Sequence, residues 1–329
     1  MSDITVLGTG AYVPERIVSS DEVGAPAGVD GDWIIRKTKI RQRRWAAPGQ
    51  ATSDLAVAAG RTALEAAGLS AGDLSLIVVA TSTPDRPQPP TAAYVQQQLG
   101  AMSAAAFDVN AVCSGSVFAL SVAASMLARR GGHALVIGAD VYSRILDPTD
   151  RRTVILFGDG AGAMVLGTGP GPRGAGARIR HIALHTFGEL SDLIEVPAGG
   201  SRRPADRAAL DDGAQYFAMQ GREVRRFVVE QLPQLTKEFL HEAGVAAEDI
   251  AHFVPHQANG VMLDTGLEDL VLPRATTHLT LETYGNTGSA SVPITLDAAA
   301  RRGAFRTGDL VLLAGFGGGM SAGFALLQW

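Results

Sequence analysis

The sequence has one cysteine, Cys113, among 329 residues. A single cysteine excludes an internal disulfide and any cysteine-rich metal cluster, and we expect no metal site and no resident cofactor. An uninterrupted apolar run long enough to span a membrane is also missing, as is a basic leader with a cleavage site, so secretion is not expected. The formal net charge of −5 argues against a general nucleic-acid binder. These absences favour a globular protein of the cytoplasm.

The composition supplies a large core, because 46% of the residues are hydrophobic and 19% are charged. Two halves of the chain also repeat each other. Residues 67–80 match residues 243–256, and the same offset of 176 residues brings 132–139 onto 308–315 and 110–113 onto 286–289. The glycine-rich ends of the halves correspond at a shorter offset, which places an insertion near residues 142–153.

Each half has the pattern of a helix, a glycine turn, an apolar strand, a loop, a helix and a strand. Residues 54–67 are predicted to form a helix, and the apolar runs at 74–80 and 134–137 are typical of strands buried on both faces. Strands that alternate with helices predict an α/β fold. We therefore expect two similar sheets packed through shared helices, with an N-terminal half at 1–172 and a C-terminal half at 173–329.

Cys113 is expected at a turn between a strand and a helix, because a short apolar run precedes it and a helix-forming run follows at 116–129. A thiol at the start of a helix faces the positive end of the helix dipole, which favours the thiolate and lowers the thiol pKa. Thiolates attack carbonyl carbon, so this position suits covalent catalysis. Taken alone, a single cysteine is more often a small buried hydrophobic residue.

Two polar side chains of the second half fall at comparable turns. His256, in PHQAN at 255–259, follows a predicted strand, and Asn286, in GNTGSAS at 285–291, occupies the turn that the repeat pairs with the one before Cys113. Ligand sites in α/β sheets favour the carboxyl ends of strands. Each residue alone also has a structural interpretation: histidines are often simply solvated, and asparagine tolerates left-handed backbone angles in a turn.

Together these motifs resemble the β-ketoacyl-acyl-carrier-protein synthase III family. The resemblance runs nearly end to end, in the family's order: GTGAYVP at 8–14, Cys113 on its turn, FGDGAG at 157–162, PHQAN, GNTGSAS, and FGGG at 316–319. It implies the thiolase fold, an internally duplicated α/β fold with five layers, αβαβα. It also implies a homodimer.

The resemblance implies an enzyme that forms a carbon–carbon bond. Cys113 matches the nucleophile that takes an acyl group from acyl-CoA. His256 and Asn286 match the pair that binds the carbonyl of a malonyl thioester while CO₂ leaves, after which the enolate attacks the acyl-Cys. The backbone amides of Cys113 and Gly318 match the oxyanion hole, and Asn259 matches a residue that orients His256. Acyl-CoA and the malonyl thioester are then substrates, and no cofactor is implied.

The resemblance also implies contacts to CoA. Trp33 matches the tryptophan that stacks on the adenine, and Arg151, in DPTDRRT at 147–153, matches the arginine on the other side of that ring. Lys37 stands where many members have an arginine. Phe316 and Asn259 complete the set of implied substrate-binding residues.

Three departures from the family pattern concern the acyl pocket and the carrier. QPP at 88–90 stands where Phe-Pro often lies across the dimer, so an acetyl starter cannot be assumed. The helix after PHQAN is acidic, with Val261 in place of an arginine, and would repel an acidic acyl carrier protein. Arg222 and Arg226 are the candidate carrier-docking residues. The departures favour polyketide or other secondary-metabolite biosynthesis over fatty-acid initiation.

Two other functions fit the same motifs. An acyltransferase of this fold would move the acyl group to a hydroxyl or an amine, but it would not need both His256 and Asn286. A non-catalytic partner subunit of a synthase pair would not need an intact set of Cys113, His256 and Asn286. The condensing enzyme is therefore the first hypothesis.

Overall fold

The structure is a computed structural model that describes residues 4–169, 171, 176–270 and 272–329. Within these residues the main sheet has ten strands, in the order β12-β11-β13-β14-β8-β1-β7-β6-β4-β5. The strands of the first half are β1 (Ile4–Tyr12), β4 (Leu74–Ala80), β5 (Ala105–Val109), β6 (His133–Asp140) and β7 (Gly160–Thr168). Those of the second half are β8 (Ala177–Thr186), β11 (Ile250–Pro255), β12 (Thr276–Thr277), β13 (Leu310–Gly317) and β14 (Ser321–Gln328).

The two halves share one topology. The strands of each half can be numbered one to five along the chain. From the place where β1 meets β8, the sheet then continues outward in both halves in the order one, five, four, two, three. The offset of 176 residues also holds for the elements, because β4 and β11 begin at Leu74 and Ile250. Two residue pairs between β1 and β8 join the halves into one continuous sheet. The sequence predicted two separate sheets. The predicted boundary between residues 172 and 173 lies outside the described residues.

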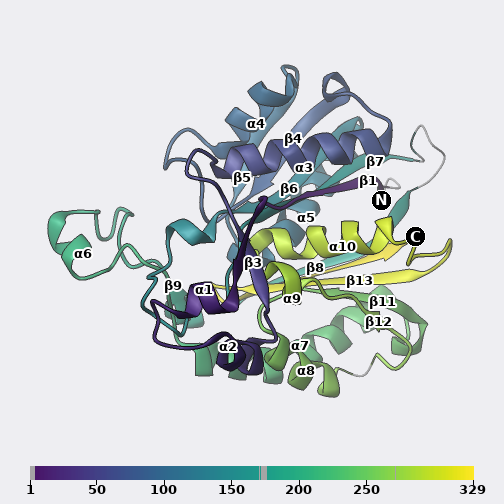
Figure 1. Ribbon diagram of the computed structural model, residues 1–329. Coiled ribbons are helices and arrows are strands. Elements are labelled where there is room, and N and C mark those ends of the chain that lie inside the picture. Colours follow the sequence, from purple (N-terminus) through teal and green to yellow (C-terminus); the bar gives the residue numbers. More distant parts are fainter. Residues whose placement is uncertain (1–3, 170, 172–175, 271) are drawn as a thin grey trace.

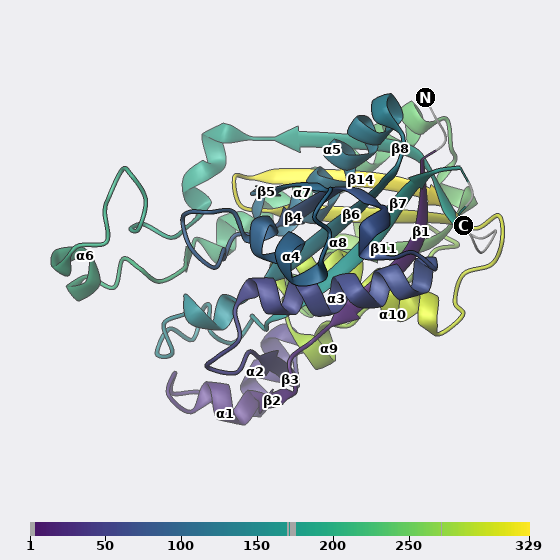
Figure 2. The ribbon, with the colours of Figure 1, turned by 90° about the horizontal axis from the view of Figure 1, so that it is seen from above.

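Helices and half-sheets alternate in five layers, as Figures 1 and 2 show. The first half-sheet is covered by α3 (Thr52–Ala67) and α4 (Thr91–Leu99), and the second by α7 (Gly221–Ala243) and α8 (Gly260–Asp269). Between the half-sheets lie α5 (Gly115–Arg130) and α10 (Ser291–Arg301), whose buried Leu120 and Leu296 belong to one shared core. The predicted αβαβα thiolase fold is confirmed.

The equivalent helices α3 and α7 end in the same way. Each stops at a glycine in the left-handed region, Gly68 with φ 70° and Gly244 with φ 65°. Glycine pays no steric penalty there, and its backbone N–H caps the last turn. At the other end, α3 starts two residues earlier than predicted, because the Asp54 carboxylate accepts the Ala51 N–H and starts the helix at Thr52.

Helix α5 corrects one expectation. Within the described residues, Val112–Arg130 is long and apolar enough by length and composition to cross a membrane, and half of its most apolar stretch is buried. The sequence was expected to contain no such segment, because small residues interrupt every apolar run. In Figure 1, α5 lies in the middle layer between the two half-sheets, which is the place of a core helix.

Additional elements decorate this core. The connection between β6 and β7 spans residues 141–159, whereas the equivalent one between β13 and β14 spans 318–320, so the insertion predicted near 142–153 is confirmed. The arm around α6 projects away from the body in Figures 1 and 2. The smaller elements are α1 (Ser20–Gly24), α2 (Gly31–Thr38), α6 (Arg207–Asp211), α9 (Leu281–Tyr284), β2 (Arg16–Ser19), β3 (Gln42–Trp45), β9 (Ile194–Glu195) and β10 (Ala218–Met219).

Candidate active site

Cys113 lies in a tight turn, Val112–Ser114, between the end of β5 and the start of α5, as the sequence predicted. Val112 has a φ of 46°, in the left-handed region that a β-branched residue rarely adopts. Backbone strain of this kind is found mostly at functional sites. The FGGG segment packs against the turn: a Cβ on Gly317 would lie 2.7 Å from the Cys113 nitrogen, and one on Gly318 would lie 3.2 Å from a Val112 methyl group. The turn that carries Cys113 and the segment that carries Gly318 are therefore neighbours, as an oxyanion hole formed by their two amides requires.

His256 directly follows β11 and is 2% exposed. Its backbone N–H donates to the Ala314 carbonyl over 2.7 Å, and its ring meets Phe316 edge to face with centroids 5.0 Å apart. The ring nitrogen Nδ1 lies 2.6 Å from Ser291 Oγ. These contacts turn the other ring nitrogen, Nε2, toward the cavity that His256 and Phe316 line.

Asn286 is held by the insertion loop of the first half. Its backbone N–H donates to the Leu156 carbonyl over 2.9 Å, and its carbonyl accepts the Gly158 N–H over 3.0 Å. The side-chain oxygen Oδ1 accepts the Gly288 N–H over 2.9 Å, which leaves Nδ2 for the cavity that Asn286 lines. The amide group is thereby oriented as a hydrogen-bond donor.

One cavity of about 230 Å³ brings Cys113, His256 and Asn286 together, although they are far apart in the sequence. Its walls are mostly apolar, which strengthens electrostatic interactions inside it. Lys37 lies at its polar side. Further residues in its lining, most of which the sequence did not single out, are Thr38, Arg152, Ile155, Leu156, Phe157, Ile194, Phe217, Met219, Gly221, Val224, Arg225, Ala258, Asn259, Met262, Phe316, Gly317 and Met320.

The protonation state of Cys113 differs from the expectation. Burial, and after it the nearby Asp140 carboxyl, raise the pKa of the thiol from its usual 9.0 to about 12. Hydrogen bonding by Tyr142 and by the Cys113 backbone N–H acts in the opposite direction but is outweighed. The lowered pKa expected from the helix dipole is therefore wrong. Desolvation disfavours the charged form more than the helix terminus favours it.

His256 is also neutral. Burial lowers the pKa of its imidazole from 6.5 to about 3, because no carboxylate offsets the loss of water. A neutral imidazole carries one N–H, so His256 can donate one hydrogen bond to a ligand. With the Asn286 amide, the site presents two uncharged donors opposite the thiol.

An aromatic cluster, Tyr142, Phe157 and Phe217, stands beside Cys113. The Tyr142 ring is 1% exposed, stacks on Phe157 at 4.3 Å between centroids, and meets Phe217 edge to face at 5.7 Å. Its hydroxyl lies 2.9 Å from Ser82 Oγ. Phe157 and Phe217 line the cavity, and Tyr142 fills the space behind them. The sequence analysis missed this cluster, although Tyr142 opens the insertion that it recognised.

Trp33 and Arg151 meet at the protein surface. The Arg151 guanidinium carbon lies 6.0 Å from the centroid of the half-buried Trp33 ring, in a cation–π contact. The structure therefore brings together the two residues that were predicted to flank an adenine. They are absent from the cavity lining, whereas Lys37 and Arg152 contribute to it, so the pair marks an approach to the cavity.

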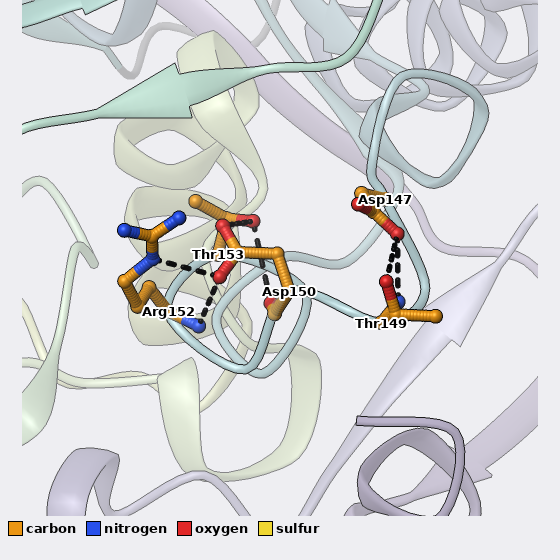
Figure 3. Close-up of polar contacts among 5 residues, drawn as sticks. All are labelled: Asp147, Thr149, Asp150, Arg152 and Thr153. Carbon is orange, nitrogen blue, oxygen red and sulfur yellow. Dashed lines mark hydrogen bonds and ion pairs between the residues drawn. The ribbon is translucent and has the colours of Figure 1, made fainter. Parts of the chain in front are cut away.

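The loop that carries Arg151 is held by its own side chains, as Figure 3 shows. The Asp147 carboxylate accepts hydrogen bonds from the backbone and hydroxyl of Thr149, over 2.8 and 2.7 Å. The Asp150 carboxylate accepts the backbone N–H and the guanidinium Nε–H of Arg152, over 3.0 and 2.8 Å. Turns of this type are local and need no ligand to form. The conformation of this loop therefore rests on hydrogen bonds within its own residues.

Asn259 differs from its expected role. Its Oδ1 accepts the N–H groups of Val261 and Met262, over 2.9 and 3.2 Å, and so caps α8. Its Nδ2 donates to the Lys37 carbonyl over 3.2 Å. The expectation that Asn259 orients His256 is therefore wrong, because the side chain is used to join α8 to α2.

The candidate carrier-docking residues lie on α7. Arg222 is exposed, whereas Arg226 pairs with Glu223 one turn away. Val261 is 38% exposed on α8, and Asp264 pairs with Lys39. Ion pairing neutralises much of the positive charge that an acidic carrier would need.

Comparison with known proteins places the chain among condensing enzymes. The family described as 3-oxoacyl-[acyl-carrier-protein] synthase III matches residues 107–188, and its C-terminal family matches residues 240–329. Acetoacetyl CoA synthase NphT7 of Streptomyces sp. (strain CL190) is 72% identical over all of both chains. The β-ketoacyl-[acyl-carrier-protein] synthase III of Rhodopirellula baltica is 41% identical over 100% of this chain and 99% of its own.

Solved structures agree with this placement. The priming β-ketosynthase of the R1128 polyketide pathway superposes with a TM-score of 0.89 at 35% identity, over 99% of this chain and 96% of its own. The fold and the cavity thus define a condensing enzyme of the thiolase fold. The chain belongs to the β-ketoacyl-[acyl-carrier-protein] synthase III family.

Proposed function

We propose that this enzyme joins an acetyl group to a malonyl thioester with loss of CO₂ and releases an acetoacetyl thioester of CoA. The observation that carries the proposal is the cavity that Cys113 lines together with two neutral donors, His256 and Asn286. The name of the relative at 72% identity, acetoacetyl CoA synthase, supports the same product. Neither half-reaction needs a metal or a redox cofactor.

The first half-reaction is a thioester exchange. The Cys113 sulfur forms a bond to the acyl carbon of acyl-CoA while the bond from that carbon to the CoA sulfur breaks, and the thiol proton ends on CoA. The backbone amides of Cys113 and Gly318 stabilise the negative oxygen that develops in between; one donor of this kind typically contributes about 3 kcal/mol. Because the resting thiol is neutral, its proton must leave as the new bond forms.

The second half-reaction needs donors and no strong base. As the malonyl carboxylate leaves as CO₂, its electron pair moves onto the thioester oxygen and creates an enolate. His256 Nε2–H and Asn286 Nδ2–H donate to that oxygen, in a cavity where such hydrogen bonds are strong. The enolate carbon then attacks the acyl-Cys113 carbonyl, and the cysteine leaves and recovers a proton.

The size of the cavity favours a short acyl group. The Tyr142 ring fills the space next to Cys113 and is held by Phe157, Phe217 and Ser82. A longer chain attached to Cys113 would have to displace this buried ring. We therefore propose acetyl-CoA as the starter, in place of the undefined acyl group that the sequence allowed.

The surface favours malonyl-CoA over a malonyl carrier protein. Arg226 is already paired with Glu223 and Val261 is apolar, which weakens the basic face that Arg222 and Arg225 alone would offer to an acidic carrier. CoA instead has Trp33, Arg151 and Lys37 near the cavity, whereas Arg152 is paired with Asp150. A product left on CoA suits secondary metabolism better than fatty-acid initiation. The cytoplasmic location stays a prediction.

We also propose a homodimer that forms through β5. This strand is an edge of the main sheet, and its Phe107 and Val109 are only half-buried. Met102, just before it, is 70% exposed. An apolar edge strand with free backbone groups is an aggregation hazard unless something covers it. A second copy of β5 across a twofold axis would satisfy both edges at once.

Intact-mass analysis tests the proposed reaction. The enzyme is exposed to acetyl-, butyryl-, hexanoyl- and octanoyl-CoA, and we expect a gain of acetyl mass that Cys113→Ala abolishes. Malonyl-CoA or malonyl carrier protein is then added and ¹⁴CO₂ is trapped, and His256→Ala and Asn286→Ala should still acylate but release little CO₂. Acylation without any CO₂ release would support plain acyl transfer, and absence of acylation would support an inert partner subunit.

A further inference from the structure

The contact between Ser291 and His256 lies behind the catalytic ring. Ser291 is the first residue of α10, and its side chain is completely buried. Its Oγ lies 2.6 Å from His256 Nδ1, on the side of the ring opposite to Nε2. Through the offset of 176 residues, Ser291 is the counterpart of Gly115, which starts α5 beside Cys113.

The direction of this hydrogen bond follows from a second contact. The backbone N–H of Gln257 points to the same Ser291 Oγ over 3.3 Å. An N–H can only donate, so the oxygen of Ser291 accepts there. Among the described residues, His256 Nδ1 is the acceptor that remains for the Ser291 hydroxyl proton, and a buried hydroxyl rarely stays without an acceptor.

We infer that Ser291 is a positioning residue that holds His256 in the tautomer with its proton on Nε2. Nδ1 accepts the serine hydroxyl, and the neutral ring therefore carries its only proton on the nitrogen that faces the cavity. The inference rests on the proposed function, in which Nε2–H donates to the enolate oxygen. In the other tautomer a lone pair would face that oxygen and repel it.

The expected effect is confined to the second half-reaction. Ser291→Ala removes the hydroxyl and frees His256 to adopt either tautomer, so CO₂ release should fall roughly 10- to 100-fold, the range found when a group that orients a metal-binding histidine is lost. Acylation of Cys113 does not use His256 and should keep its rate. Ser291→Thr keeps the hydroxyl and should recover most of the CO₂ release.

A double-mutant cycle separates positioning from simple packing. In a His256→Ala background, Ser291→Ala should cause no further loss of CO₂ release, because the ring that it orients is gone. Ser116→Ala is the matched control. Ser116 is a buried serine on α5 whose hydroxyl has no hydrogen-bond partner in the described part of the chain, and its loss should leave both half-reactions unchanged.

Nitrogen NMR tests the tautomer without any variant. Long-range ¹H–¹⁵N correlation on the wild-type protein, with His256 assigned by its loss in His256→Ala, should show the proton on Nε2. A proton on Nδ1, CO₂ release within twofold of wild type in Ser291→Ala, or equal losses with and without His256 would overturn the inference. If wild-type enzyme releases no CO₂ from malonyl thioesters, the proposed function fails, whereas the NMR result still decides the tautomer.

Discussion

The raised pKa of Cys113 predicts how its alkylation depends on pH. At pH 8, a thiol with a pKa of about 12 has about one thiolate in ten thousand molecules, against about one in ten for a thiol at the usual 9.0. Only the thiolate reacts with iodoacetamide. The alkylation rate of the ligand-free enzyme should therefore rise about tenfold for each pH unit from 7 to 10, without a plateau.

The assay is clean because Cys113 is the only cysteine. Mass spectrometry follows the loss of unmodified protein, and circular dichroism confirms the fold at each pH. A matched control carries Cys113→Ala and Ser125→Cys, which moves the thiol to an exposed site on α5. Its rate should level off near pH 9. Poor access to the cavity would lower the Cys113 rates at every pH without changing their slope. A plateau below pH 9 for Cys113 would show that the helix dipole outweighs burial, and would refute the reasoning.

Three further predictions concern the starter, CoA and the dimer. Tyr142→Leu should raise acylation by butyryl-CoA about tenfold relative to acetyl-CoA, because burying each of the two added methylenes contributes about 0.8 kcal/mol. Tyr142→Phe should leave this selectivity unchanged. If mass-detected competition between the two acyl-CoAs shows no change in Tyr142→Leu, the aromatic cluster does not limit the length of the acyl group. Trp33→Ala should raise the KM for acetyl-CoA roughly tenfold at constant kcat, since base stacking contributes about 1–3 kcal/mol, and a KM that does not move would remove Trp33 from the CoA site. Phe107→Asp should yield monomers in analytical ultracentrifugation. Ile17→Asp, which changes an exposed apolar residue of β2, is the control and should stay dimeric. A dimeric Phe107→Asp variant would place the interface elsewhere.

Much of the fold could be predicted from the sequence because the two halves of the chain repeat each other. The match between residues 67–80 and 243–256 makes β4 the equivalent of β11, and the same offset makes α5 the equivalent of α10. The alternation of strands with helices then predicted that layers of helices cover the sheets. The hydrogen bonds that join β1 to β8 escaped prediction, because they depend on how two finished halves dock and leave no periodic signal.

The three polar residues that meet in the cavity were predictable, whereas the groups that surround them were not. Cys113, His256 and Asn286 stand at strand ends in distinctive motifs. Ser291 lies in the same GNTGSAS motif as Asn286, but its use shows only when α10 is placed behind the ring of His256. The thiol pKa was mispredicted for the same reason: the helix dipole is a local feature, whereas burial comes from residues far away in the chain.

The duplication also explains why the site needs both halves. The turns before α5 and α10 are equivalent, and they pack against each other. Asp140 of the first half accepts the backbone N–H and the hydroxyl of Ser289 in the second, both over 2.8 Å, and so ties the end of β6 to the turn before α10. One copy of the turn then carries Cys113, the proposed nucleophile, while the other is free to present Asn286, the proposed donor. In the proposed reaction, two equivalent strand ends with different side chains thus supply the two sides of one site.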